Sequence, residues 1–178
     1  IENFDFYDLT AIVKKSWIVD FCKKIEERNM TFTWQLPSGT HSEAIDSEVA
    51  TLLYKSDCRN MSYSPESGSI GLLERIKKKI SLYSVISSID ASFMNNMNIK
   101  TNMIFGFPEE TLQEIFESYR SIIRMAIAGA YDISIWAFSP YPGSELFNHI
   151  SATGKLKMDD AYYDSLRLYA DPSKTVSY

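Results

Sequence analysis

The sequence contains few of the residues that usually hold metal ions or carry out acid–base catalysis. Its only cysteines are Cys22 and Cys58 and its only histidines are His41 and His149, and their spacing matches no zinc or iron–sulfur ligand set. Both cysteines stand in apolar surroundings, which predicts buried, unreactive thiols. The chain has no Ser/His/Asp set, P-loop or G-x-G-x-x-G motif, and a His-centred mechanism is not expected.

Excess positive charge and long apolar runs are also missing. The net charge is −5, and the largest basic cluster is "RIKKKI" at residues 75–80, which we expect to be a solvated helix end or loop rather than a nucleic-acid site. No apolar stretch is long enough to span a bilayer, and the acidic N-terminus is unlike a signal peptide. We therefore expect a cytoplasmic protein with no nucleic-acid or membrane partner.

The composition, 45% hydrophobic and 13% aromatic, is enough for one substantial core. Strand and helix patterns alternate along the chain. The predicted strands cover residues 3–7, 30–35, 59–64, 99–106 and 131–138. The predicted helices cover residues 14–29, 46–55, 69–79 and 84–97, a long segment after residue 111, and a short one after residue 144. We expect the main domain at residues 1–150, and a C-terminal helix with a Tyr-rich tail at residues 151–178.

This alternation predicts an α/β fold with a parallel sheet of five βα steps. A doubly wound open sheet and a fragment of a barrel fit the pattern equally well. In both architectures ligands bind beyond the carboxyl ends of the strands. The loops at those ends, "DLT", "LPSGTH", "SPESGS", "GFPEET" and "SPYPGS", are therefore where a site is expected.

The segment after residue 111 has the clearest helical pattern. Thr111 and Glu114 have the spacing of a capping box. An apolar stripe follows with the spacing of a face that packs on a sheet, formed by Leu112, Ile115, Phe116, Tyr119, Ile122, Ile123 and Ala126. Similarly, Asp46 is placed to cap the helix at residues 46–55.

Three of the five loops carry a carboxylate, and two of these, "SPESGS" and "GFPEET", combine it with Ser, Gly or Pro turn chemistry. Glu109 either binds a ligand or complements the helix dipole, and Glu66 belongs either to a site or to a plain turn. Gly68 allows a ligand or a tight turn to come close, and Ser69 is placed to cap the next helix. Asp8 is either a ligand carboxylate or a solvated one. The loop "SPYPGS" is either a rigid helix entry or part of a site.

Taken in order, the segments "FDFYD", "FTWQLPS", "CRNMSYSPESGS", "NMIFGFPEET" and "FSPYPGSELF" resemble the later part of the core of radical S-adenosylmethionine (radical SAM) enzymes, closest to the cobalamin-associated branch. The resemblance covers residues 3–148. It implies a partial (β/α)6 barrel without its first unit. It also implies a [4Fe-4S] cluster, held by a CxxxCxxC loop after the first strand, and reductive cleavage of S-adenosylmethionine to a 5′-deoxyadenosyl radical.

The resemblance also implies a set of cofactor-binding residues. Asp8 stands at the strand end near the methionyl amino group. Glu66 and Ser67 match the "ESG" that approaches the methionyl or ribose portion, and Ser38 closes the matching "FTWQLPS" segment.

On the adenosine side, Ile104, Gly106 and Glu109 match the G-x-I-x-G-x-x-E motif, which lies against adenine and ribose. Phe138 and Ser139 begin the last-strand segment, whose backbone approaches adenine.

The chain departs from the family pattern at several positions. It has no CxxxCxxC, so no cluster ligands are expected in it. Asn102 replaces the first Gly of the motif, Gly39 stands where an Arg is common, and Leu9 where a second Asp is usual. Glu109 occupies the usual Gly before the acidic residue, so either Glu109 or Glu110 is the motif carboxylate.

Three hypotheses follow. The first is a C-terminal piece of a longer radical SAM enzyme, inactive alone, whose cluster loop and any cobalamin domain lie upstream. The second is a noncatalytic binding or scaffold domain that kept the barrel. The third is an unrelated α/β enzyme in which Glu66 and Glu109 converge on one ligand. A barrel without its first strand also exposes a strand edge, so we expect self-association.

Overall fold

The computed structural model describes residues 2–7, 12, 14–38, 40–41, 44–154 and 156–167. Asp8, Leu9 and Gly39 lie outside the described residues. Five strands form one parallel sheet in the order β1-β2-β3-β4-β5. They are β1 (Asn3–Asp5), β2 (Thr33–Leu36), β3 (Cys58–Glu66), β4 (Asn98–Phe105) and β5 (Asp132–Ala137). The predicted parallel α/β fold is thus confirmed.

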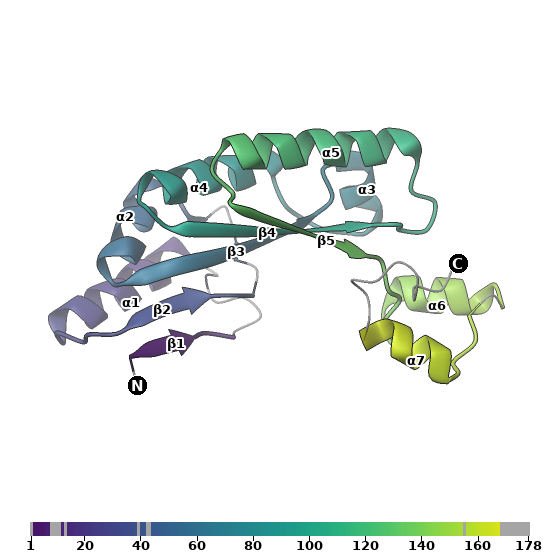
Figure 1. The fold of residues 1–178 in the computed structure, drawn as a ribbon, viewed down its shortest axis with the longest axis horizontal. Coiled ribbons are helices and arrows are strands. Elements are labelled where there is room, and N and C mark those ends of the chain that lie inside the picture. The colour runs from purple at the N-terminus through teal and green to yellow at the C-terminus, as the bar shows by residue number, and fades with distance from the viewer. Residues whose placement is uncertain are drawn as a thin grey trace.

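Helices connect the strands along one face of the sheet (Figure 1). They are α1 (Lys15–Glu27), α2 (Ser47–Lys55), α3 (Ile70–Arg75), α4 (Leu82–Met94) and α5 (Leu112–Ile127). The strand order follows the chain without the reversal that defines a doubly wound sheet. Helix α3 ends at Arg75, well before the predicted residue 79, and Lys77 has left-handed backbone angles with φ at 58°.

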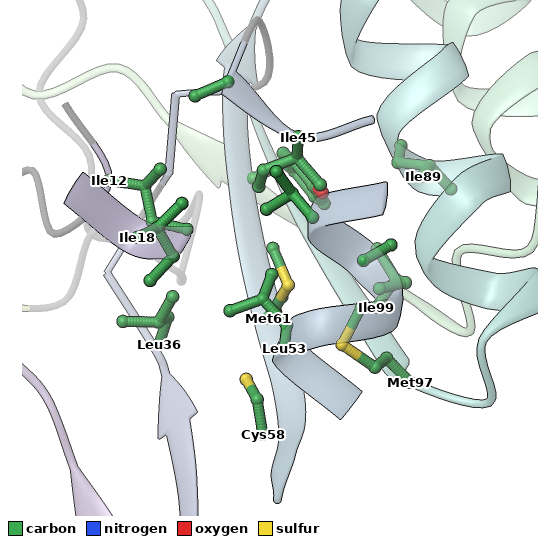
Figure 2. Packing of buried hydrophobic residues seen from close by; sticks show 14 of the residues in the cluster. Ile12, Ile18, Leu36, Ile45, Leu53, Cys58, Met61, Ile89, Met97 and Ile99 are labelled. Carbon is green, nitrogen blue, oxygen red and sulfur yellow. The ribbon is translucent and has the colours of Figure 1, made fainter. Parts of the chain in front are cut away.

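The main core lies between the sheet and these helices. Along β4, Ile99, Thr101 and Met103 are fully buried on the helix side, because side chains alternate between the faces of a strand. Figure 2 shows Ile99 among side chains from α2 and α4. Tyr63 reaches α4, where its hydroxyl lies 2.6 Å from that of Ser88, and burial raises the pKa of Tyr63 to about 12.

The opposite face of the sheet is polar and is joined by side-chain hydrogen bonds. The amide of Asn98 donates to Asn60, that of Asn60 to Gln35, and that of Gln35 to Asp5, over distances of 2.6–2.9 Å. This chain of amides connects β4 to β1 through every strand between them. It aligns neighbouring strands on a face that α1 to α5 do not cover (Figure 1).

Helix α5 has the opposite orientation to the one its apolar pattern suggested. Its buried residues are Glu114, Ser118, Ser121 and Met125. Most of the predicted inward stripe is exposed, with Leu112 at 74%, Phe116 at 67% and Ile123 at 59%. The small serines face inward because the loop after β3 packs against them. The predicted caps at Asp46 and Thr111 are confirmed, whereas the Ser69 side chain makes no cap hydrogen bond.

Beyond β5, helices α6 (Glu145–Ala152) and α7 (Asp160–Arg167) lie together at the carboxyl end of that strand (Figure 1). A second apolar cluster joins them to the rest of the molecule through Leu72, Phe107, Phe138 and Ile150. Tyr162 anchors α7, because its hydroxyl donates to the Pro140 carbonyl over 2.7 Å. The predicted domain boundary at residue 150 falls inside α6, and the division into two domains stays a prediction.

Both cysteines are buried free thiols, as predicted. In the part of the chain that the structure describes, no helix combines the length and apolarity needed to cross a membrane.

Gly68 is where the loop after β3 touches α5. A Cβ at this position would lie 2.7 Å from both the Glu117 carbonyl oxygen and the Ser118 Cα. The Gly68 amide also donates to the Ser118 hydroxyl over 3.0 Å. Close helix packing, not the approach of a ligand, therefore accounts for this glycine.

We predict that Gly68→Ala lowers the free energy of unfolding by about 1–3 kcal/mol, since the new methyl group overpacks a rigid contact. Gly71→Ala in α3 is the matched control. Its Cβ would meet its nearest atom at 3.8 Å, so it should be neutral or stabilise by up to about 1 kcal/mol. Urea denaturation of both variants measures the difference, and equal stabilities would contradict the packing argument.

Candidate functional site

A cavity of about 360 Å³ lies at the carboxyl ends of β3, β4 and β5. Four of the residues expected to bind a cofactor line it, namely Glu66, Ile104, Phe138 and Ser139. The remaining lining comes from the last two strands and the segment that leads into α6: Phe107, Trp136, Ala137, Tyr141, Ser144 and Leu146. Three strand ends thus converge on one mostly apolar hollow with four aromatic rings and a single carboxylate.

Glu66 supplies that carboxylate from a constrained backbone. Its φ is 70°, a left-handed conformation that costs a non-glycine residue about 1–2 kcal/mol. Other non-glycine residues with positive φ, such as Asn29 and Asn96, lie in turns at helix ends, whereas Glu66 ends a strand. Its side chain is 27% exposed and forms an ion pair of 2.7 Å with Lys78. The backbone therefore presents the carboxylate at the cavity, where Lys78 balances its charge.

Asn102 fixes Trp136, another residue that lines the cavity. The indole N–H donates to the Asn102 side-chain oxygen over 3.2 Å, and the Asn102 amide donates to the hydroxyls of Ser62 and Ser64. The polar replacement for the expected glycine thus has a structural explanation, because it orients an aromatic ring that lines the cavity.

The turn "GFPEET" separates the roles of its two glutamates. The Glu110 carboxylate accepts a 2.6 Å hydrogen bond from the Gly106 amide, its other oxygen is buried without a hydrogen-bond partner, and burial raises its pKa. Glu109 is exposed, with φ at 60°, the conformation that a glycine takes most easily. Glu110 therefore closes the turn, while Glu109 occupies a position suited to Gly. Gly106 is exposed, and no atom lies within 4 Å of where its Cβ would be.

We predict opposite effects of substitution at these neighbouring positions. Glu109→Gly relieves the left-handed strain and should raise the free energy of unfolding by about 0.5–1 kcal/mol after the added chain entropy is subtracted. Glu110→Ala leaves the Gly106 amide without its acceptor and should lower the free energy of unfolding by about 1–2 kcal/mol. Thermal and urea denaturation test both. A destabilised Glu109→Gly variant would contradict the conclusion that Glu109 occupies a position suited to glycine.

Glu114 fixes the position of this turn relative to α3 and α5. Its two carboxylate oxygens accept from Arg75 over 2.8 and 3.0 Å, and one also accepts from the Thr111 amide over 2.8 Å. The Glu114 side chain is only 12% exposed. The hydrogen bonds from Arg75, followed by those from Thr111, lower the pKa of Glu114 to about 2.

The pKa of Glu114 predicts how stability depends on pH. The pKa is lower in the folded protein than its ordinary value of 4.5, so the stabilisation is complete above about pH 4.5 and is lost as the pH falls through about 2. Glu114→Gln should therefore lower the free energy of unfolding by about 1.5–3 kcal/mol at pH 7. The difference from the wild type should become smaller as the pH falls.

Glu145→Gln is the control, since the pair between Lys77 and Glu145 is exposed and should contribute less than about 0.5 kcal/mol. Urea denaturation at several pH values gives both differences. A Glu114 effect that does not change with pH would contradict the proposed charge interaction.

The other predicted site residues lie elsewhere. The Ser67 side chain is fully buried and is hydrogen-bonded to Ser118 and to the Ser69 amide. Ser38 follows Pro37, which lines a second cavity of about 330 Å³ on the polar sheet face. Glu109 does not line the cavity that holds Glu66, so the structure does not bring these two carboxylates together around it.

Arg75, Lys78 and Trp136 were not among the site residues predicted from the sequence. The signal for the first two was the cluster "RIKKKI", which was interpreted as a solvated segment. Arg75 and Lys78 in fact pair with Glu114 and Glu66 at the strand ends. A basic cluster directly after an acidic strand-end loop was therefore the informative pattern.

The described residues contain no group of three or more His, Cys, Asp or Glu side chains able to hold a metal ion. Cys22 and Cys58 do not fit an iron–sulfur cluster. Both are buried in the main core, and burial raises the pKa of each thiol, whereas cluster ligands must be thiolates.

Comparison with known proteins gives relatives at low identity. The chain matches no protein-family model. An uncharacterized methyltransferase, PH0819, from Pyrococcus horikoshii is 24% identical over 156 residues, which are 88% of this chain and 33% of that protein. This chain therefore spans about a third of the length of the curated relative it matches.

Solved structures of radical SAM enzymes share the fold. The radical SAM methyltransferase TsrM from Kitasatospora setae, with cobalamin and a [4Fe-4S] cluster bound, superposes with a TM-score of 0.64 at 12% identity, over 83% of this chain and 29% of TsrM. Coproporphyrinogen III oxidase (HemN) from Escherichia coli gives a TM-score of 0.57 at 14% identity, over 82% of this chain and 32% of HemN. At such identities the likeness shows the fold alone.

Proposed function

We propose that this chain is the S-adenosylmethionine-binding part of a radical SAM enzyme and that its sheet is the second to sixth units of a partial (β/α)6 barrel. The observation that carries the proposal is the cavity at the strand ends. Of the residues singled out by their resemblance to radical SAM motifs, four line that one hollow, and these four come from three separate strand ends. The sequential strand order and the shared fold support the same conclusion.

The lining suits the chemical groups of this cofactor. Glu66 would accept hydrogen bonds from the methionyl ammonium and replace its present partner Lys78. Trp136 and Phe138 offer aromatic faces to adenine, and Ser139 offers polar groups for hydrogen bonding. Gly106 does not line the cavity, but the open space where its Cβ would lie allows the backbone after β4 to approach a ligand.

The chain itself would bind and orient the cofactor. S-adenosylmethionine supplies the activated methyl and adenosyl groups of the reaction, and reductive cleavage belongs to the whole protein, because the cysteines here do not fit a cluster. The name of the Pyrococcus relative and that of TsrM both include methyltransferase. These names suggest methyl transfer as the reaction of the whole protein to which this chain belongs. A cobalamin-binding domain upstream agrees with the TsrM likeness.

A second candidate is a binding or scaffold domain that kept the barrel and lost the chemistry. The ion pair between Glu66 and Lys78 favours it, because the carboxylate at the cavity is already neutralised. The two candidates differ in whether this chain binds S-adenosylmethionine.

Isothermal titration with S-adenosylmethionine tests the proposal. Saturable binding is expected, and Glu66→Gln should weaken it by about 1–3 kcal/mol, or roughly 5- to 150-fold in Kd, the range for losing a charged hydrogen-bond partner. Glu145→Gln, an exposed carboxylate at the start of α6, is the matched control and should leave Kd unchanged. Glu109→Gln reports separately on the second motif carboxylate.

Absence of saturable binding would contradict the proposal and favour the scaffold. Binding with equal affinity by the wild type and Glu66→Gln would place the cofactor outside this cavity.

A further inference from the structure

The second cavity, of about 330 Å³ on the polar face of the sheet, has no part in the proposed function. Among the residues that line it are Gln35, Asn60, Asn98, Lys100 and Asn102, which come from three neighbouring strands. Its volume lies within the range of small-molecule sites, about 300–1,000 Å³. Helices α1 to α5 cover the other face of the sheet (Figure 1). The cavity is therefore large enough to take a small molecule, and these helices do not fill it.

Side-chain amides are frequent in this lining although they are uncommon in strands. Asn is depleted in β-strands, yet Asn60, Asn98 and Asn102 lie in β3 and β4. The hydrogen bond to Trp136 accounts for Asn102. Asn60 and Asn98 are partners in the register of the two strands, and strand propensity does not explain either of them. The amide groups themselves therefore need a role.

These amides keep hydrogen-bonding groups that the protein does not use. A side-chain amide has two N–H donors and a carbonyl with two lone pairs. The links from Asn98 to Asn60 and from Asn60 to Gln35 each use one N–H and one lone pair. The Asn98 carbonyl accepts no hydrogen bond from the residues that the structure describes. A donor and an acceptor thus remain on one planar group, which an amide group of a ligand can match.

Lys100 is the single charged side chain among the described residues that line the cavity. It lies between Asn98 and Asn102 on the polar side of β4, because alternate side chains of a strand share a face. Its Nζ is 3.3 Å from the Asp132 carboxylate, whereas the other lysine pairs of the described residues measure 2.6–2.7 Å. An ammonium group has three N–H donors, so this loose pair leaves donors for an anion.

We propose that the second cavity binds a small carboxylic acid that carries amide groups. The carboxylate of this ligand pairs with Lys100, and its amide groups bond to the unused donors and acceptors of Asn60 and Asn98. A hydrogen bond between an ammonium and a carboxylate is about twice as strong as one between neutral groups. Lys100 therefore selects an acid, and the side-chain amides select what the acid carries. A short peptide with a free carboxyl end has both kinds of group.

Asn102 connects this cavity to the first one. It lines the second cavity, and its side-chain oxygen accepts a hydrogen bond of 3.2 Å from Trp136, which lines the first. A ligand in one cavity is thus close to the other. Under the proposed function, on which this step alone rests, the amide-bearing acid is the class of substrate that lies beside S-adenosylmethionine.

Isothermal titration with N-acetyl-alanyl-alanine, without S-adenosylmethionine, tests the site. This probe has two amide groups and one carboxylate, and it should bind saturably. The same probe with a C-terminal amide in place of the carboxylate should bind weaker by about tenfold or more. Hexanoate has the charge but no amide group. It should also bind more weakly than the probe, because it leaves Asn60 and Asn98 without partners.

Three variants assign the contacts to residues. Lys100→Met should reduce the affinity for the acid probe to that for its C-terminal amide, because the carboxylate no longer meets a cation. Lys55→Met is the matched control and should leave Kd unchanged, since Lys55 is exposed at the end of α2 on the helix side of the sheet. Asn98→Ala should weaken both probes and leave the ratio of their Kd values unchanged. Circular dichroism confirms that each variant is folded.

Absence of saturable binding by the acid probe would overturn the proposal, as would equal affinity for the acid and its C-terminal amide. Equal affinity for hexanoate would also overturn it, because the side-chain amides would then have no part in recognition. The result is independent of the proposed function. A chain that binds the acid probe but not S-adenosylmethionine would keep this site and reject that function.

Discussion

The carboxylate of Glu114 is the contact on which the geometry of the strand-end loops depends. It binds Arg75 through both oxygens and the Thr111 amide through one of them, so a single buried group joins α3, the turn after β4 and the start of α5. Because Arg75 is held, α3 stays beside the turn, and the nearby Lys78 can reach Glu66. A local capping interaction thereby organises loops from two different βα units.

The two faces of the sheet have different roles as a consequence of the one-sided helical cover. The helix side is apolar and provides most of the stability through burial. The other side carries Asn98, Asn60 and Gln35 in a chain of hydrogen bonds, and the same chemistry continues toward the cavity, where Asn102 orients Trp136. Polar groups on this face satisfy one another, which keeps the strands in register up to the candidate site.

Much of the fold followed from the sequence, whereas less of the site did. Alternating strand and helix patterns were enough to predict a parallel α/β sheet, because backbone hydrogen bonding and apolar periodicity are local properties. The motif residues Glu66, Ile104, Phe138 and Ser139 were identified by resemblance and lie around one cavity. The contributions of Arg75 and Lys78 were missed, because ion pairs between residues 12 and 39 positions apart leave no periodic signal.

Helix α5 is the element for which the prediction from the sequence and the structure differ most clearly. The sequence alone determined that residues 112–127 form a capped helix with one apolar and one polar side. Only the tertiary structure decided which side faces inward: Gly68 needs small serines opposite it, so Ser118 and Ser121 turn toward the loop and the apolar stripe turns outward. Periodicity specifies the faces of a helix, but the shape of the surface it packs against selects between them.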